Sequence, residues 1–231
     1  MRAWETAQEQ IMTWRIGVDS GGTFTDVCLF DEGSGQVVTW KVSSTPDDPS
    51  RGITQGVAEG LQQVRATAAD VSFLGHGTTV ATNALIQGRG VKTGLITTDG
   101  FRDLLEIGRQ KRPHLYDLQA DKPETLVPRD LRMGVAERMR PDGTVEEALD
   151  ADAFREAVRV LKAEGVKSVA VSFLYSFLNA EHEKTAAAIL AEEFPEAFVA
   201  ISHRIAPEFR EYERLSTTVV NAYLGPVMQL Y

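Results

Sequence analysis

The segment Asp19-Ser-Gly-Gly-Thr-Phe-Thr-Asp26 constrains the fold of this chain more than any other stretch. β-prone residues stand directly before it at Ile16 and Val18, and directly after it from Val27 to Phe30. Two such runs joined by a glycine pair predict a β-hairpin. This hairpin would gather two carboxylates, two threonine hydroxyls and two glycines at a single turn.

The glycines and threonines of this turn are typical of a loop that binds an anion. Gly21 and Gly22 have no Cβ, so their backbone can approach a phosphate group closely. Successive N–H groups in such a turn form an anion-binding nest. Thr23 and Thr25 add hydroxyl donors. We therefore predict that the turn binds the phosphates of a nucleotide.

The two carboxylates are candidate catalytic residues. Asp19 follows the first strand and is predicted to hold a magnesium ion through water, because hard cations prefer carboxylate oxygens. Asp26 would do the same or orient a threonine. The alternative is a plain hairpin whose glycines only make the turn, but the acids and threonines around them favour phosphate binding.

The rest of the chain alternates between helix and strand patterns. A third strand is expected at Val37–Val42, and Asp48-Pro49 has the pattern of a helix start. Val71–Gly75 is expected to be a short buried strand. Ser168–Tyr175 is almost continuously apolar, as in a strand buried on both faces. The alternation predicts an α/β fold with mixed sheets.

A second candidate site is His76-Gly-Thr-Thr79, just before a helix expected at Val80–Gln87. Helix N-termini attract anions because their first N–H groups are unpaired. Gly77 allows close approach, and Thr78 or Thr79 would cap the helix. The alternative is a capped helix with a core histidine, and the residues themselves leave both interpretations open.

The third candidate is the basic run Arg109-Gln-Lys-Arg-Pro-His114. Arginine can bind a carboxylate or phosphate through two parallel hydrogen bonds, so Arg109 and Arg112 are candidate contacts to an anionic substrate. A solvated loop is the alternative for a charge run of this kind. Further on, Glu208–Arg214 alternates charges and rings, and we interpret it as an ion-paired helix face.

Several stretches together resemble one family. "RIGVDSGGTFTDVCLFD" is similar to the first phosphate loop of the actin/hexokinase/Hsp70 ATPase superfamily, and its Gly-Gly-Thr-Phe-Thr-Asp form resembles in particular the hydantoinase A / 5-oxoprolinase / acetone carboxylase group. Further resemblance to that group lies in "HGTTVATNAL", "GFRDLLEIGRQKRPHLYDL", "SFLYSFLNAEHE" and "ISHRIAPEFREYERLSTTVVNAYL". The resemblance covers about residues 14–231, after an N-terminal extension at 1–13.

The resemblance implies a fold and a reaction. The fold would be an actin-like ATPase (ribonuclease-H-like) lobe, with a mixed sheet flanked by helices. ATP with Mg²⁺ would phosphorylate the amide oxygen of a cyclic amide, such as a hydantoin or 5-oxoproline, so that water can open the ring. Asp19 would hold the metal, the Gly21-Gly22-Thr23 backbone the phosphates, and Asn83 would add a ligand contact. The ketone-carboxylase branch would instead activate a ketone and bicarbonate.

Members of that group are much longer and carry a second Gly-Gly-Thr motif, which this chain lacks. The resemblance therefore implies that the second ATPase lobe is missing from 14–231, as a C-terminal lobe or a partner subunit. A non-catalytic fragment that binds such a partner is one alternative. A small-molecule kinase is another, but no sugar-kinase motif accompanies Asp19–Asp26.

Composition narrows the class of protein further. The net charge is −9, and an acidic surface repels nucleic-acid phosphates. Cys28 is the single cysteine, so no internal disulfide forms, which is typical of a reducing compartment. The longest apolar stretch is far shorter than the roughly 20 residues that span a bilayer, and residues 1–14 lack a signal-peptide core. We expect a soluble, cytoplasmic protein without nucleic-acid or membrane partners.

The end of the chain suggests self-association. Residues 215–231 have the pattern of a helix that stops without a terminator. We predict that the apolar stripe of this helix is exposed, and because large apolar patches are seldom left in water, we expect an oligomer. The stripe consists of Leu215, Val219, Val220, Leu224 and Val227.

We expect the chain by itself to hydrolyse ATP slowly or not at all. The resemblance implies a nucleotide held between two lobes, each with one phosphate loop. Loss of a single preorganised donor typically lowers a rate about a hundredfold, so loss of a lobe is far worse. A coupled ATPase assay on the purified chain measures this. Turnover near ~10 s⁻¹, a typical enzyme value, would contradict the prediction.

Overall fold

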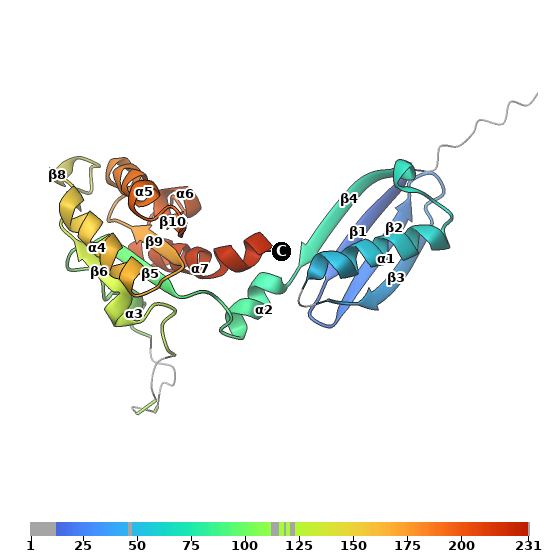
Figure 1. Ribbon diagram of the computed structural model, residues 1–231, viewed down its shortest axis with the longest axis horizontal. Coiled ribbons are helices and arrows are strands. Elements are labelled where there is room, and N and C mark those ends of the chain that lie inside the picture. The colour runs from blue at the N-terminus through green and yellow to red at the C-terminus, as the bar shows by residue number, and fades with distance from the viewer. Residues whose placement is uncertain (1–12, 46–47, 112–115, 118, 121–122, 231) are drawn as a thin grey trace, which may run out of the picture. The chain divides into compact units, whose positions relative to one another are not determined.

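The computed structural model describes residues 13–45, 48–111, 116–117, 119–120 and 123–230. The chain divides into two compact units, one up to Gly88 and one from Arg89 onward (Figure 1). The sequence patterns give no boundary at this point within residues 14–231. No helix among the described residues is long and apolar enough to cross a membrane.

Unit 1 is a four-stranded mixed sheet in the order β3-β2-β1-β4. β1 and β2 form the predicted antiparallel hairpin, β3 pairs antiparallel with β2, and β4 pairs parallel with β1. The elements are β1 (Trp14–Ser20), β2 (Phe24–Asp31), β3 (Val37–Ser43), α1 (Pro49–Gln63), the 3₁₀ turn η1 (Ala68–Asp70), β4 (Val71–Thr78) and α2 (Val80–Ile86). The hairpin and the third strand are therefore confirmed.

Helix α1 covers one face of this sheet (Figure 1). It begins as predicted, because the Asp48 carboxylate accepts a hydrogen bond from the Ser50 N–H at 3.1 Å and Pro49 follows the cap. Two helical glycines bring it close to β2: a Cβ at Gly56 would meet Val27 Cγ2 at 2.9 Å, and one at Gly60 would meet a Leu29 methyl at 3.0 Å. The apolar positions Ile53, Val57 and Leu61, which mark one side of this helix in the sequence, do not reveal this close approach.

The other face of the unit 1 sheet carries exposed aromatic side chains, among them Phe24, Phe30 and Phe73. Strand β4 was expected to be short and buried over Val71–Gly75. It instead extends to Thr78 at the edge of the sheet, where Leu74 is 57 % exposed. The prediction was wrong because an apolar run does not distinguish an edge strand from a central one.

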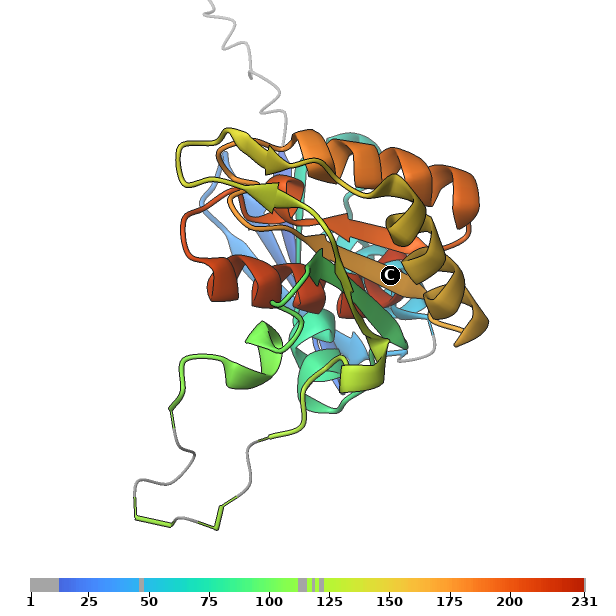
Figure 2. The same ribbon diagram turned by 90° about the vertical axis from the view of Figure 1, so that its left-hand side faces the viewer.

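Unit 2 contains a four-stranded parallel sheet in the order β10-β9-β5-β6. Helices α4 and α5 pack together on one face, and α7 packs on the other (Figure 2). Its elements are β5 (Thr93–Thr98), α3 (Leu104–Ile107), η2 (Arg129–Leu131), β6 (Arg132–Val135), β7 (Arg138–Met139), β8 (Val145–Glu147), α4 (Ala151–Ala163), β9 (Ser168–Ser172), α5 (Glu181–Glu193), β10 (Phe198–Ile201), α6 (Ser202–Ile205) and α7 (Glu211–Leu230).

The structure contradicts the predicted exposed stripe on the last helix. Leu215 and Val219 belong to the core of unit 2, and Leu224 is also buried. Val220 and Val227 are only half-buried. The reason is that a parallel sheet is buried on both faces. Helices α4 and α5 cover one face of this sheet, and the apolar side of α7 covers the other.

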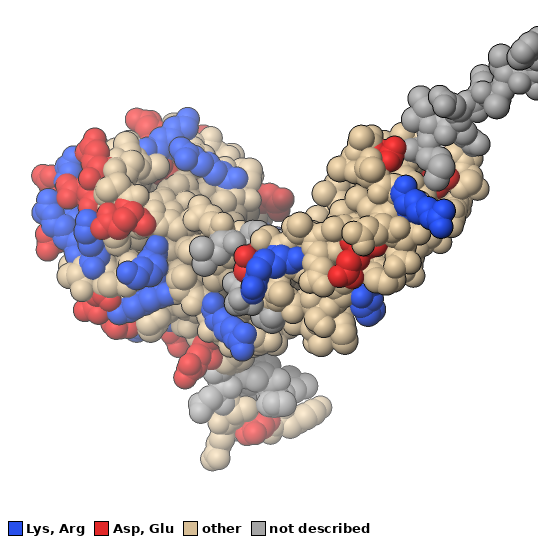
Figure 3. Space-filling view, turned by 45° about the vertical axis from the view of Figure 1, so that its right-hand side comes forward, with Lys and Arg blue, Asp and Glu red and all other residues tan. Residues whose placement is uncertain are grey.

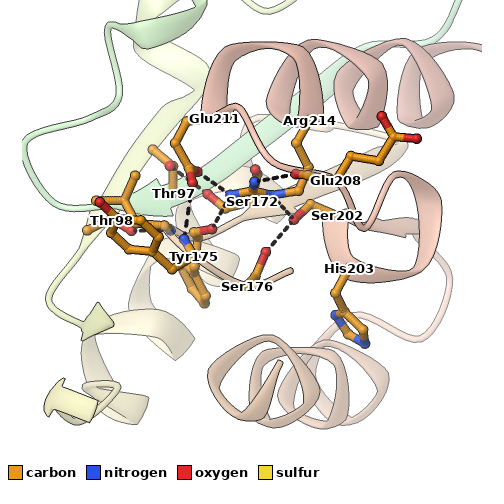
Figure 4. A network of polar contacts seen from close by, with 12 residues as sticks. Thr97, Thr98, Ser172, Tyr175, Ser176, Ser202, His203, Glu208, Glu211 and Arg214 are labelled. Atoms are coloured by element: carbon orange, nitrogen blue, oxygen red, sulfur yellow. Dashed lines mark hydrogen bonds and ion pairs between the residues drawn. The ribbon is translucent and has the colours of Figure 1, made fainter. Parts of the chain in front are cut away.

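Arg214, in the first turn of α7, is the centre of a buried polar network (Figure 4). The charge pattern of Glu208–Arg214 predicted an ion-paired helix face. Arg214 does form an ion pair, but it is only 1 % exposed. Its guanidinium donates to the carbonyls of Phe173 at 3.0 Å and Glu208 at 3.1 Å and to Ser202 Oγ at 3.2 Å, and it pairs with Glu211. It therefore ties α7 to the chain that follows β9 and β10.

The buried carboxylate of Glu183, on α5, holds the same ends of β9 and β10 from the other face of the sheet. It accepts hydrogen bonds from the Phe173 N–H at 2.9 Å and from Ser202 Oγ at 2.6 Å. It also accepts from the His203 N–H at 2.9 Å, and His203 Nδ1 lies 2.7 Å away. Together, Glu183 and Arg214 bind both strand ends.

Glu183→Ala is expected to destabilise the chain by about 3 kcal/mol or more, because several buried donors lose their charged acceptor. The exposed Glu192 on the same helix is the control, and its replacement by Ala should change the free energy of unfolding by less than about 0.5 kcal/mol. Urea denaturation followed by circular dichroism measures both. Equal midpoints for the two variants would show that the network contributes nothing to stability.

Candidate functional site

Two acidic residues lie side by side on the open face of the unit 1 sheet. Asp19 on β1 pairs with Asp26 on β2, which pairs with Lys41 on β3. On its other side Asp19 pairs with Gly77 on β4. Lys41 Nζ lies 2.9 Å from Asp26 Oδ1 and neutralises that carboxylate. Asp19 has no such partner among the described residues, so its carboxylate is available for a ligand.

The turn between β1 and β2 presents two unpaired backbone donors. The Gly21 N–H donates to the Phe24 carbonyl at 3.0 Å and closes the turn, and the Thr23 carbonyl accepts from the Ser44 N–H at 3.0 Å. Within the described part of the chain, the N–H groups of Gly22 and Thr23 have no hydrogen-bond partner. Both residues are exposed, so these two donors can bind an anion such as a phosphate.

Thr25 lies under the turn rather than at its mouth. Its side chain is buried, and its hydroxyl lies 3.0 Å from Ser44 Oγ. Ser44 Oγ in turn donates to the Gly21 carbonyl at 2.7 Å. The predicted phosphate donor therefore supports the turn from the covered side of the sheet. Sequence reasoning missed Ser44, because its role depends on the pairing of a third strand.

The second predicted motif lies beside this turn. Because β4 runs parallel to β1, Thr78 pairs with Ser20 and its hydroxyl donates to the Ser20 carbonyl at 3.2 Å. The Thr78 hydroxyl also accepts from the Val80 N–H at 3.1 Å, so Thr78 caps α2. Thr79 is the N-cap residue, but its hydroxyl accepts from the Asn83 amide at 3.1 Å instead.

Asn83 connects α2 to the glycine turn. A Cβ built on Gly22 would lie 3.7 Å from Asn83 Nδ2, so the side-chain amide stands next to the unpaired donors. His76 differs, because its register partner is Val18, which faces α1. Paired residues of neighbouring strands project to the same side. His76 is thus exposed on the face opposite to Asp19.

The open face is hollowed next to Asp19. A shallow pocket of ≈ 410 Å³ is lined by Asp19 and Asp26 together with residues that have small side chains, including Gly17, Gly75 and Gly77. Among the described residues no group of three or more His, Cys, Asp or Glu side chains could hold a metal ion. One or two carboxylates do suit Mg²⁺, which takes its other ligands from water and phosphate oxygens. Asp19 fits that role.

The third predicted site belongs to unit 2. The Arg109 Nε donates to Glu213 Oε1 at 2.5 Å, and the guanidinium is about half exposed. Partial burial by itself raises the pKa of the Glu213 carboxyl. The hydrogen bond from Arg109 and nearby cations have a larger opposite effect, so the pKa lies below its ordinary value. Arg112 lies outside the described residues. On the face in Figure 3, acidic and basic side chains of unit 2 are interspersed, without an extended basic surface.

Comparison with known proteins identifies the family of this chain. Residues 15–194 match the family described as hydantoinase/oxoprolinase N-terminal region. The alpha subunit of caprolactamase from Pseudomonas jessenii is 42 % identical over 224 residues, which cover 94 % of this chain and 32 % of the relative. The 5-oxoprolinase of Saccharomyces cerevisiae is 31 % identical over 255 residues, covering 94 % of this chain and 20 % of the relative.

Solved structures show the same fold. Nucleotide-free acetone carboxylase aligns with a TM-score of 0.86 at 29 % identity, over 93 % of this chain and 32 % of that one. ATP-dependent caprolactamase from Pseudomonas jessenii aligns with a TM-score of 0.80 at 42 % identity, over the same shares. The predicted actin-like α/β fold is confirmed. The chain belongs to the hydantoinase/oxoprolinase N-terminal family, and it spans about a third of the length of the caprolactamase subunit.

The two turn glycines are expected to respond differently to substitution. A Cβ at Gly21 would lie 3.0 Å from the Phe24 carbonyl oxygen, so Gly21→Ala should disturb the closing hydrogen bond and destabilise the chain by about 1 kcal/mol. Gly22→Ala meets only ordinary contacts and should stay within about 0.5 kcal/mol of the wild type. Thermal unfolding compares the two. A larger loss for Gly22→Ala would contradict the described turn.

Proposed function

We propose that this chain is the first phosphate-binding part of an ATP-dependent enzyme that opens cyclic amides. The observation that carries the proposal is the β1–β2 turn, where the unpaired N–H groups of Gly22 and Thr23 lie beside the free Asp19 carboxylate. The relatives support the substrate class, since they include a caprolactamase and a 5-oxoprolinase.

Each group at the turn has a distinct task in this proposal. The N–H groups of Gly22 and Thr23 donate to phosphate oxygens and stabilise the charge that develops there during phosphoryl transfer. Asp19 holds Mg²⁺ through water, and Asn83 adds a polar contact from α2. Asp26, already paired with Lys41, keeps a balanced charge next to Asp19. ATP, when bound, would transfer its γ-phosphoryl group to the amide oxygen and leave as ADP. Water would then attack the activated carbon, and the ring would open with release of inorganic phosphate.

The remaining groups are proposed to come from outside this chain. A single turn can donate hydrogen bonds to the phosphates from one side only, whereas phosphoryl transfer needs donors on all sides of the transferred phosphoryl group. The chain spans about a third of the caprolactamase alpha subunit. We therefore assign the opposite phosphate loop to a further lobe or partner subunit, and we expect the active form to be an assembly of both.

Ketone carboxylation is the second candidate. It is favoured by the structural similarity to acetone carboxylase, with a TM-score of 0.86. Both reactions use the same phosphate turn, so the turn does not distinguish them. The two reactions are distinguished by measuring ATP turnover of the complete enzyme with lactams, with hydantoins, and with ketones plus bicarbonate. Turnover stimulated by ketones and not by cyclic amides would replace the first proposal with the second.

Asp19→Ala is expected to lower Mg²⁺-dependent ATP turnover of the complete enzyme by about a hundredfold or more, because transition-state charge loses its metal support, while the fold stays intact. The matched control is Glu32→Ala, which removes an exposed carboxylate from the chain just after β2. Steady-state kinetics and circular dichroism on both variants test this. Wild-type turnover in Asp19→Ala would refute the role given to the turn.

A further inference from the structure

Unit 2 has a pocket of its own between α3 and α7. Its volume is ≈ 600 Å³, within the roughly 300–1,000 Å³ of small-molecule sites. The lining combines apolar side chains with polar and charged ones, which include Arg109 and Ser216. The apolar walls come from Leu105, Leu126, Tyr212, Val219 and Val220. Mostly apolar walls with a few polar groups are the usual composition of a ligand site.

Two segments that line the pocket connect to the carboxyl ends of the parallel strands. The chain leaves β5 toward β6 on one side and leaves β9 toward β10 on the other, so the strand order reverses between β5 and β9. Ligands of open α/β sheets bind beyond the carboxyl ends of the strands at such a point. Helix α3 follows β5, and the first turn of α7 contacts the loop after β9 through Glu211, which accepts from the Tyr175 N–H at 3.2 Å.

Unusual backbone conformations surround this part of α7. Non-glycine residues with positive φ are uncommon, yet Gln110 at φ 55° and Arg210 at φ 88° flank the pocket and the helix start, and Tyr175 at φ 55° contacts Glu211. Gly108, at φ 55°, packs against the Tyr212 ring. Strained residues gather at ligand sites because the surrounding structure must hold them in place.

The charges of the pocket favour an uncharged ligand. Two cationic residues line it, Arg109 and Lys111, and two acidic ones balance them, Glu106 and Glu124. Glu213 already occupies one edge of the Arg109 guanidinium. An anion would find no net positive charge here. A neutral carbonyl oxygen would still find guanidinium N–H donors at the rim of an apolar chamber.

We infer that the α3–α7 pocket binds an uncharged cyclic amide, with the apolar ring between α3 and Val219–Val220 and the carbonyl oxygen facing the Arg109 guanidinium. This inference rests on the proposed function for the choice of amide, and it places the substrate in unit 2. The phosphate turn belongs to unit 1, so the two sites are tested separately.

The test titrates the ¹⁵N-labelled chain with ε-caprolactam and follows backbone amide shifts by NMR. Saturable shifts are expected at Gly108, Ser216 and Val220. Ser216→Phe fills the pocket and should weaken the apparent Kd at least about tenfold, whereas the control Thr217→Phe, at an exposed neighbour on α7, should leave it unchanged. Arg109→Met, at an exposed side chain, should weaken binding by about tenfold through loss of a charged hydrogen bond.

Two further titrations separate the possible failures. 5-Oxoproline carries a carboxylate on a cyclic amide and should bind more weakly than ε-caprolactam, because the pocket does not compensate a buried anion. A non-hydrolysable ATP analogue with Mg²⁺ should shift Gly22 and Thr23 instead. Absent or unsaturable lactam shifts, equal shifts in Ser216→Phe, or tighter 5-oxoproline binding would each overturn the pocket assignment. Missing nucleotide shifts would count only against the phosphate turn.

Discussion

The candidate phosphate site depends on β1 pairing with two strands at once. Antiparallel pairing with β2 sets Asp19 against Asp26, and parallel pairing with β4 sets Asp19 against Gly77. The second pairing brings in Asn83, far from the glycine turn in sequence, so that its side-chain amide stands next to Gly22. Without β4 in this register the hairpin would still form, but the turn would lose its neighbour on α2.

Unit 2 is held together by a different kind of interaction. Arg214 and Glu183 are buried charges, each surrounded by hydrogen-bond partners from the ends of β9 and β10. Buried charges are tolerated when paired and hydrogen-bonded, and removal of one partner is strongly destabilising. In this account, the network fixes the start of α7, which forms one wall of the unit 2 pocket through Tyr212.

The local patterns predicted the parts of this structure that depend on local chemistry. The hairpin at Asp19–Asp26, the cap at Asp48-Pro49 and the buried strand beginning at Ser168 follow from turn chemistry, capping and apolar runs. The features that the sequence patterns did not predict depend on contacts between residues distant in sequence. The burial of Arg214 and the placement of Thr25 under the turn require knowing which strands and helices pack together, and no local period carries that information.

The central claim is that the β1–β2 turn binds nucleotide phosphate through its backbone. The most direct measurement is a crystal structure of the complete enzyme with Mg²⁺ and a non-hydrolysable ATP analogue. We expect phosphate oxygens about 2.7–3.2 Å from the N–H nitrogens of Gly22 and Thr23, with the metal near Asp19. Phosphates bound elsewhere, with these two N–H groups still facing solvent, would contradict it.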